Sequence, residues 1–272
     1  EREAGAMKKY NVAVVGATGL VGRTILKVME ERRFPVGTLV CLASRKSAGE
    51  VLKYEDREIV VKELDENSFD EGIDIAFFSA GGSISEKFAP IAASKGVVVV
   101  DNSSVFRMNE QVPLVVPEVN GEDSFSNKGV IANPNCSTIQ CMLPLKAIMD
   151  SYGIKRVVYS SYQSVSGSGT KGLRDLYEGL SEFYPFPIQN NVLPHIDVFL
   201  ENGYTKEEMK MIEETRKILH APELKVTATT VRVPVRFAHS VSVNLELEKD
   251  FQVEDVKRIL SEIGRASCRE RV

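Results

Sequence analysis

The chain has 272 residues, which is enough for two domains or for one large domain. Its hydrophobic fraction of 43% and charged fraction of 26% are ordinary for a globular protein, and its formal net charge of −4 gives no reason to expect a nucleic-acid or membrane partner. The sequence has no apolar run of membrane-spanning length, no signal peptide and no CxxC pair among its four cysteines, so we expect a cytoplasmic protein without a disulfide framework or a zinc site.

Both ends of the chain look foreign to the protein. Met7, followed by two lysines, is typical of a natural start, and residues 1–6 then derive from upstream translation or a cloning remnant. Residues 263–272 break a helical pattern abruptly and resemble a translated sequencing adapter. We therefore expect non-native tails at 1–6 and 263–272 and a fragment that is truncated at its C-terminus.

The first predicted element is a buried strand at residues 10–15, which leads into the sequence GATGLVG at residues 16–22 and an amphipathic helix to about Arg32. Glycines in a strand-to-helix turn let the backbone approach a pyrophosphate, which then lies at the helix N-terminus. A glycine-rich triplet alone is weak evidence, and a merely tight turn is the alternative. The flanking strand and helix favour dinucleotide binding around Gly16 and Gly19.

A second strand, at residues 38–43, ends at Ser44 and Arg45. An NAD site usually places an acidic residue near this point to bind the ribose 2′-hydroxyl, whereas an arginine accommodates the 2′-phosphate of NADP. Ser44 and Arg45 therefore favour NADP over NAD. The alternative is a solvated basic loop.

Strands and helices alternate through the rest of the N-terminal half, with strands at 73–78 and 97–100 and a helix at 84–95 between them. This alternation, with small residues at the strand ends, predicts an α/β fold with a doubly wound parallel sheet. In such a sheet the ligand lies along the carboxyl edge. We assign this Rossmann-type NADP-binding domain to residues 7–132.

The sequence NPNCST at residues 133–138 lies between a short strand at 129–132 and a helical pattern. Cys136 is therefore expected at a helix N-terminus, where unpaired N–H groups and the positive dipole end favour a thiolate, the nucleophilic form of cysteine. The alternative is a small buried core cysteine. Cys141 is expected to face the core.

After Cys136 the pattern changes to long strands with period-two alternation, at 155–165, 225–233 and 240–247. Helices are expected up to about Leu180, at 206–219 and from Val253. Such strands, with helices gathered between them, predict an α+β domain with one exposed sheet face. We assign this catalytic and dimerisation domain to residues 133–262 and regard it as incomplete.

The chain resembles aspartate-β-semialdehyde dehydrogenase of the bacterial type, from about residue 10 to about residue 262. Four blocks carry the resemblance: GATGLVG, NPNCST, SYQSVSG at 161–167 and VRVPVRFAHS at 231–240. The resemblance implies NADPH-dependent, reversible reductive dephosphorylation of L-aspartyl 4-phosphate to L-aspartate 4-semialdehyde through a cysteine thioester, in lysine, threonine and methionine biosynthesis. The implied partners are a small-molecule substrate and phosphate, and the full-length protein is expected to be a homodimer or homotetramer.

The resemblance also implies catalytic roles. Cys136 matches the acylated nucleophile, His239 the general acid/base, and Gln163 the residue that orients the thioester. From the residues alone, His239 could instead be a structural histidine and Gln163 could cap a sheet edge. We interpret His195 and His220 as structural.

Four further residues match positions that bind the substrate. Arg232 matches the residue that clamps the substrate carboxylate, Arg107 and Lys210 the phosphate-binding pair, and Glu207 an acidic partner on the amine side. An arginine fork suits a carboxylate or phosphate, which it binds bidentately. Without the resemblance, the arginines would be surface or ion-pair residues, and Glu207 and Lys210 a plain i,i+3 surface pair.

The expected cofactor-binding residues lie in the glycine-rich turn, after the second strand and after Gln163. They are Gly16, Thr18, Gly19, Leu20, Val21, Ser44, Arg45, Ser166 and Gly167. No metal is expected. Two other functions stay open: an N-acetyl-γ-glutamyl-phosphate reductase, whose cysteine turn normally has a Gly-Cys-Tyr type sequence, and a non-catalytic NADP-binding paralogue. Because the family continues beyond the end of this chain, we expect the fragment to lack normal stability and activity.

Overall fold

The computed structural model describes residues 8–263. The tails expected at 1–6 and 263–272 lie outside the described residues, apart from Ile263. Contacts divide the chain into two compact units. The N-terminal unit runs up to Leu114 and includes Asp123–Asn133, and the C-terminal unit comprises Val115–Glu122 and the chain from Pro134 onwards. The domain boundary expected after residue 132 lies next to this division and stays a prediction.

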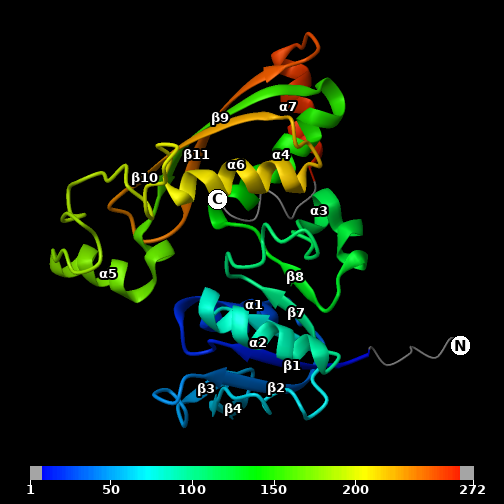
Figure 1. Cartoon of the computed structure of the whole chain (residues 1–272), viewed down its shortest axis with the longest axis vertical. Coiled ribbons are helices and arrows are strands. Elements are labelled where there is room, and N and C mark those ends of the chain that lie inside the picture. The colour runs from blue at the N-terminus through cyan, green and yellow to red at the C-terminus, as the bar shows by residue number, and fades with distance from the viewer. Residues whose placement is uncertain (1–7, 264–272) are drawn as a thin grey trace, which may run out of the picture. The chain divides into compact units, whose positions relative to one another are not determined.

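The N-terminal unit is built on a six-stranded sheet in which every strand pair is parallel, in the order β5-β2-β1-β6-β7-β8 (Figure 1). The strands are β1 (Tyr10–Val15), β2 (Val36–Ala43), β5 (Lys62–Glu63), β6 (Ile75–Phe78), β7 (Val98–Asp101) and β8 (Val130–Ala132). The two main helices of this unit are α1 (Leu20–Glu31) and α2 (Gly82–Ser94). The predicted doubly wound parallel sheet is confirmed.

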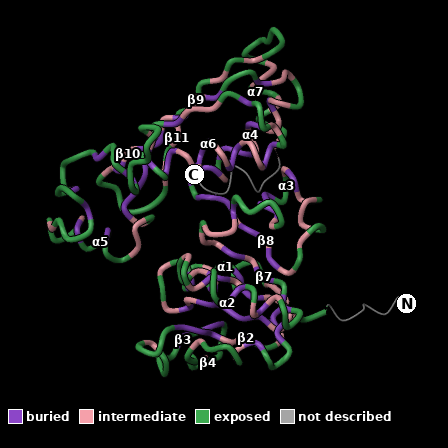
Figure 2. Tube along the Cα trace, viewed as in Figure 1, coloured by how far each residue is buried: buried purple, intermediate pink, exposed green. Residues whose placement is uncertain are grey.

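Successive residues of β1 are buried on opposite faces of this sheet, because side chains alternate along a strand. Val12 and Val14 pack in one cluster with residues of α1, and Ala13 and Val15 pack in another with residues of α2. A strand covered on both faces reads as a continuous apolar run, which is why the sequence signal at residues 10–15 is so strong. Figure 2 maps this burial along the chain.

The sequence did not predict a hairpin in the N-terminal unit. The strands β3 (Val51–Tyr54) and β4 (Arg57–Val60) form an antiparallel hairpin, and Glu55 in its turn has a φ of 50°. Leu52 and Tyr54 are buried and join the cluster that covers α1. The hairpin therefore contributes to the core of this unit.

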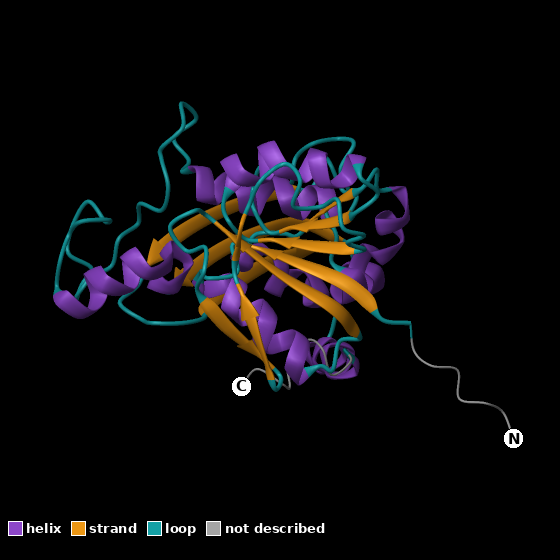
Figure 3. Ribbon diagram, turned by 90° about the horizontal axis from the view of Figure 1, so that it is seen from below, coloured by secondary structure: helices purple, strands orange, loops and turns teal. Residues whose placement is uncertain are grey.

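The C-terminal unit holds a mixed three-stranded sheet in the order β10-β9-β11. Figure 3 shows the strands of the molecule in orange and the helices in purple. The central strand β9 (Ile154–Gln163) pairs in parallel with β10 (Lys225–Arg232) and antiparallel with β11 (His239–Leu247). Its helices are α3 (Pro117–Asn120), α4 (Cys136–Tyr152), the 3-10 helix η2 (Val165–Ser168), α5 (Gly169–Glu178), α6 (Lys206–Ile218) and α7 (Val253–Glu262), while the 3-10 helix η1 (Gly121–Ser126) crosses from this unit into the other.

Helix α6 contacts β10 and α4, so it connects the sheet to the helix that begins at Cys136. Every second residue of β11 from Ser240 to Glu246 is exposed, as the predicted sheet with one solvated face requires. The α+β architecture of this part is confirmed. None of the described helices is both long and apolar enough to cross a membrane.

Candidate active site

The turn between β1 and α1 has the features of an anion-binding loop. Gly16 has a φ of 83°, and its N–H donates to the Leu42 carbonyl at 2.8 Å. A Cβ on Gly22 would lie 2.2 Å from the Gly16 carbonyl oxygen, so the turn requires glycine there. Gly19 is the N-cap of α1, whose first turn has no side-chain cap and no acidic residue. The first N–H groups of α1 therefore suit an anionic ligand such as a pyrophosphate.

Ser44 and Arg45 lie exposed in the turn that follows β2. The N–H groups of Ser47 and Ala48 donate to the Ser44 carbonyl at 2.9 and 3.2 Å. Because β2 is the parallel neighbour of β1, this turn lies at the same carboxyl edge of the sheet as the glycine-rich turn. The position suits a residue that contacts the ribose of a dinucleotide.

Arg107 follows β7 in the N-terminal unit and is 7% exposed. Its Nε donates to the Asn133 carbonyl at 2.9 Å and its Nη2 to the Asn102 carbonyl at 3.0 Å. These bonds hold the guanidinium beside Asn133, the first residue of the NPNCST block. Its expected part in phosphate binding stays a prediction.

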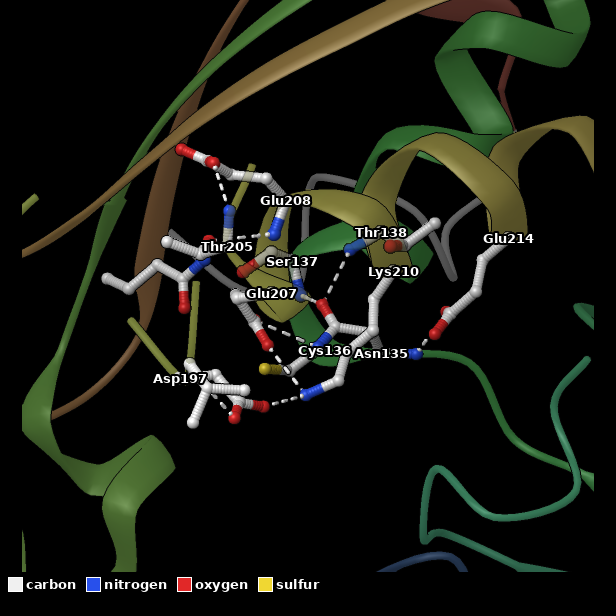
Figure 4. Close-up of polar contacts among 12 residues, drawn as sticks. Asn135, Cys136, Ser137, Thr138, Asp197, Thr205, Glu207, Glu208, Lys210 and Glu214 are labelled. Carbon is white, nitrogen blue, oxygen red and sulfur yellow. Dashed lines mark hydrogen bonds and ion pairs between the residues drawn. The ribbon is translucent and has the colours of Figure 1, made fainter. Parts of the chain in front are cut away.

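Cys136 is the first residue of α4, as predicted. Asn135 is the N-cap, and its Oδ1 accepts hydrogen bonds from the N–H groups of Ser137 at 2.8 Å and Thr138 at 3.3 Å (Figure 4). Asparagine is among the best N-cap residues because its short side chain reaches these otherwise unpaired donors. The local sequence therefore defines where this helix begins.

The cysteines differ in their surroundings. Cys136 is exposed, so its interpretation as a buried core cysteine is wrong, whereas Cys41 and Cys141 are buried. Burial raises the pKa of the Cys41 thiol to about 11 and that of the Cys141 thiol to about 12. Among the described cysteines, Cys136 alone combines exposure with a helix N-terminus, the environment that favours a thiolate.

The Sγ atom of Cys136 lies 3.2 Å from Nε2 of His239, the first residue of β11. At this distance a neutral imidazole can accept the thiol proton, and an imidazolium can stabilise the thiolate. A cysteine and a histidine in such contact form a nucleophile and base pair.

The other ring nitrogen of His239 contacts two residues, Ser164 and Ala238. Nδ1 lies 2.9 Å from the main-chain N–H donor of Ser164 and 2.9 Å from the Ala238 carbonyl oxygen. With its proton on Nδ1, the ring donates to Ala238 and presents a free Nε2 lone pair to the thiol. With its proton on Nε2, the ring accepts from Ser164. Each neutral tautomer thus has one hydrogen-bond partner at Nδ1.

Burial lowers the pKa of His239 below its ordinary value. The hydrogen bond to Ala238 opposes this effect, and the positive charge of Arg232 adds to it. The imidazole is therefore mainly neutral at neutral pH. This is the form that can act as a base toward Cys136.

Gln163 lies between Arg232 and His239 in the sheet. It ends the central strand β9 and pairs with Arg232 of β10 on one side and with His239 of β11 on the other. Neighbouring strands are about 4.8 Å apart, so the three residues share one row at the end of the sheet. Gln163 is 1% exposed, and its Nε2 donates to Ser161 Oγ at 3.0 Å. Its interpretation as an edge residue is wrong, because β9 has a partner on both sides.

Arg232 is 6% exposed, and its guanidinium is only partly satisfied. Nη1 donates to the Ser164 carbonyl at 2.7 Å, and Cζ lies 6.0 Å from the centre of the Tyr184 ring. Within the part of the chain that the structure describes, the buried Nε has no acceptor. A buried N–H group without a partner is unfavourable, so this fork suits an incoming carboxylate.

Glu207 and Lys210 lie one turn apart on α6 and form an ion pair with a second partner (Figure 4). Lys210 Nζ is 3.1 Å from Glu207 Oε2 and 3.0 Å from Asp197 Oδ2. The side chains of Glu207 and Lys210 are 8% and 20% exposed, so this i,i+3 pair is not the plain surface pair of the alternative interpretation. Burial opposes the charged form of Lys210, but the two carboxylates outweigh burial and raise the pKa of its ammonium.

A cavity of about 350 Å³ opens between these groups in the C-terminal unit. Its charged lining comes from Arg232, Lys210, Glu207 and Asp197, and it is otherwise lined by Gly167, Ser168, Phe183, Tyr184, Pro185, His195 and Ile196. Two cations and two anions therefore face one small space. Such a lining suits a small ligand that itself carries both signs of charge.

Ser166 and Gly167 lie in η2, directly after β9. The Ser166 N–H donates to the Arg236 carbonyl at 3.1 Å, and a Cβ on Gly167 would lie 3.1 Å from Arg232 Nη1. These two residues belong to the C-terminal unit, whereas the glycine-rich turn, Ser44 and Arg45 belong to the N-terminal unit. Their contact with a cofactor stays a prediction.

Sequence reasoning did not single out three residues of this site: Asn135, Tyr184 and Asp197. The N-cap position of Asn135 was a usable signal, because the residue stands directly before the helical pattern. Asp197 has a φ of 67°, and Tyr184 donates its hydroxyl to Ser168 Oγ at 2.8 Å. Both lie in the loop at 184–197, and the local sequence does not predict the contacts of this loop.

Comparison with protein families gives two matches that together span most of the chain. The family described as "Semialdehyde dehydrogenase, NAD binding domain" matches residues 11–126. The family described as "Semialdehyde dehydrogenase, dimerisation domain" matches residues 145–266.

Individual relatives carry the same name. The aspartate-semialdehyde dehydrogenase of Aquifex aeolicus is 56% identical over 265 residues, which are 92% of this chain and 78% of that protein. The crystal structure of aspartate semialdehyde dehydrogenase II complexed with ASA from Vibrio cholerae has a TM-score of 0.89 at 43% identity and covers 94% of this chain and 80% of that chain. That of the Candida albicans enzyme with NADP has a TM-score of 0.74 at 26% identity and covers 94% of this chain and 76% of that chain.

Proposed function

Since this chain belongs to the aspartate-semialdehyde dehydrogenase family of oxidoreductases, we propose that it reduces L-aspartyl 4-phosphate with NADPH to L-aspartate 4-semialdehyde and phosphate. The reaction is reversible, passes through a thioester on Cys136 and serves lysine, threonine and methionine biosynthesis in the cytoplasm. The single observation that carries this proposal is the 3.2 Å contact between Cys136 Sγ and His239 Nε2. A binding paralogue without catalysis would not need this pair.

The first half of the reaction is acyl transfer. His239 takes the thiol proton, and the Cys136 thiolate attacks the carbonyl carbon of the acyl phosphate. As the carbon–sulfur bond forms, the carbon–oxygen bond to phosphate breaks, and the leaving phosphate takes the proton that His239 accepted from the thiol. Lys210 and Arg107 bind this leaving group, because cations stabilise the charge that develops on it.

The second half is reduction of the thioester. When bound, the nicotinamide supplies the hydride that reduces the thioester carbon. Gln163 orients the thioester, and His239 donates a hydrogen bond to the oxygen of the hemithioacetal. The carbon–sulfur bond then breaks, the aldehyde is released, and the Cys136 thiolate is restored.

The substrate-binding roles follow from charge. Arg232, whose buried Nε has no acceptor in the described part of the chain, binds the substrate α-carboxylate. Glu207 faces the same cavity and binds the α-amine. A substrate that carries an amine, a carboxylate and a phosphate thus meets a group of opposite charge at each end.

The residues of the N-terminal unit fit a nicotinamide dinucleotide. Helix α1 begins without a side-chain cap at a glycine turn, which suits the pyrophosphate. Ser44 and Arg45 stand where an NAD site usually has an acidic residue, so the cofactor is NADP. The structure of the Candida albicans relative with NADP supports this choice.

Assembly is part of the proposal. The match to a dimerisation domain supports oligomerisation, and we propose a homodimer or homotetramer for the full-length protein.

The test is phosphate-dependent reduction of NADP by the full-length protein with L-aspartate 4-semialdehyde. NADPH formation that is lost in Cys136→Ser supports both the reaction and the nucleophile. Omitting phosphate from the same mixture should leave an acyl group on the Cys136 peptide, which mass spectrometry detects. Turnover with N-acetylglutamate semialdehyde in place of L-aspartate 4-semialdehyde would move the chain to the reductase alternative, and an unmodified Cys136 would contradict the thioester.

A further inference from the structure

We infer that Glu214 is a positioning residue, which holds the main chain at Asn135 and thereby sets the place of Cys136. The inference rests on the proposed function, in which Cys136 is the nucleophile. It adds a residue on α6, 79 positions after Asn135, that the catalytic scheme does not otherwise use.

Glu214 makes a direct contact with the chain just before the nucleophile. It is 1% exposed, and its Oε2 accepts a hydrogen bond from the Asn135 N–H at 2.7 Å (Figure 4). Hydrogen bonds to a carboxylate are shorter and about twice as strong as neutral ones. The bond acts on the main chain itself, one residue before Cys136.

Asn135 is held at three points. Its N–H is bound by Glu214, its Nδ2 donates to Glu207 Oε1 at 2.9 Å, and its Oδ1 accepts from the first N–H groups of α4. Glu207 and Glu214 are two turns apart on α6, so they lie on the same face of that helix. One face of α6 therefore binds both the main chain and the side chain of Asn135, the N-cap residue of α4.

A role in packing alone does not account for a carboxylate at this position. Burying a carboxylate carries a large desolvation penalty, which an apolar side chain of similar volume avoids. The carboxylate at this position binds a backbone donor and holds it at a defined place. The consequence is a fixed distance between Cys136 Sγ and its partner His239.

The same helix offers a matched control. Glu208 is also buried on α6, and its carboxylate accepts from the N–H groups of Thr205 at 2.8 Å and Thr230 at 3.1 Å. Its loss removes a capping box and a bond to β10, which are structural contacts. It has no hydrogen bond to Asn135 among those found in the described residues.

The experiment measures alkylation of Cys136 by iodoacetamide, resolved on the Cys136 peptide by mass spectrometry. Glu214→Gln keeps the acceptor at the same reach without the charge, and Glu214→Asp keeps the charge but withdraws the acceptor by one methylene. We expect alkylation in Glu214→Gln to stay within about threefold of the parent rate, and in Glu214→Asp to fall about tenfold. Glu208→Asp, compared at equal folded fraction, should alkylate at the parent rate.

A Glu214→Asp variant that alkylates at the parent rate would overturn the inference, as would an equal loss in Glu208→Asp. Alkylation of Cys136 needs no turnover of substrate, so the positioning role of Glu214 can be tested independently of the proposed reaction. The expected alkylation pattern in a chain that turns over neither semialdehyde would contradict the reaction and support the positioning. Turnover that Glu214→Asp leaves unchanged in kcat would support the reaction and contradict the positioning.

Discussion

Cys136 and His239 are 103 positions apart in the sequence, and their Sγ and Nε2 atoms lie 3.2 Å apart. One residue begins α4 and the other begins β11, so the pair depends on where a helix and a strand start within the same unit. A change that moves either start moves the reacting atoms.

Replacing the base should leave a folded but inactive chain. We expect His239→Asn to lower kcat about 10²–10⁴-fold, the range that general acid–base catalysis contributes. The control is His220→Asn, because His220 is exposed after the end of α6 and has a φ of 52°, which asparagine tolerates well. Steady-state kinetics with thermal unfolding of both variants tests this, and equal losses of activity would contradict the assignment.

The loss of activity at low pH should reflect protonation of His239. Burial lowers the pKa of this imidazole below about 6.5, its ordinary value, so the neutral base persists to a lower pH and activity falls only as pH drops through that lowered pKa. Arg232→Gln removes a positive charge that lowers the pKa further, so this loss of activity should move to higher pH. The pH profile of Cys136 alkylation measures this without substrate, and a shift to lower pH would refute it.

The glycine-rich turn should tolerate no side chain at Gly22. Gly22→Ala puts a Cβ 2.2 Å from the Gly16 carbonyl oxygen, and we expect a loss of about 3 kcal/mol in the free energy of unfolding. Gly121→Ala is the control, because its backbone is helical with a φ of −56° and nothing lies within 4 Å of the added Cβ. That variant should be neutral or more stable by about 0.5 kcal/mol. Urea unfolding curves compare the two.

The choice of cofactor should depend on Arg45. We expect Arg45→Ala to raise KM for NADPH about tenfold, the effect of losing one charge-assisted hydrogen bond, and to leave KM for NADH nearly unchanged. Lys46→Ala, in the same exposed turn, is the control for a general loss of positive charge. A uniform change for both cofactors would contradict a contact to the 2′-phosphate.

The ionised Asp197 carboxylate should contribute to the stability of the fold, and this contribution should be lost at acid pH. Burial works against its charge, but the hydrogen bonds from Lys210 and the Val198 N–H outweigh burial and lower the pKa of this carboxyl. A carboxylate with a lowered pKa stabilises the fold above its unfolded pKa of about 3.9, and this contribution disappears as pH falls through the folded value. Asp197→Asn should therefore flatten the stability profile below about pH 4. Thermal unfolding measured in assay buffers between about pH 2.5 and 7 tests this. If stability falls with pH as steeply in Asp197→Asn as in the parent, the prediction is wrong.

The sequence by itself determined the elements whose signals are local. The strand–glycine–helix order at residues 10–31 and the start of α4 at Cys136 depend on neighbouring residues, such as Gly16 before α1 and Asn135 as an N-cap. Apolar runs and alternation predicted both sheets for the same reason. These features need no knowledge of distant contacts.

Only the tertiary structure decided which distant residues meet. The row of Arg232, Gln163 and His239 depends on strand register, and a slip of one residue would turn each side chain to the other face. The contact of Glu214 with Asn135 depends on how α6 packs beside α4. Such contacts depend on packing between elements far apart in the chain, and residue type alone does not encode that packing.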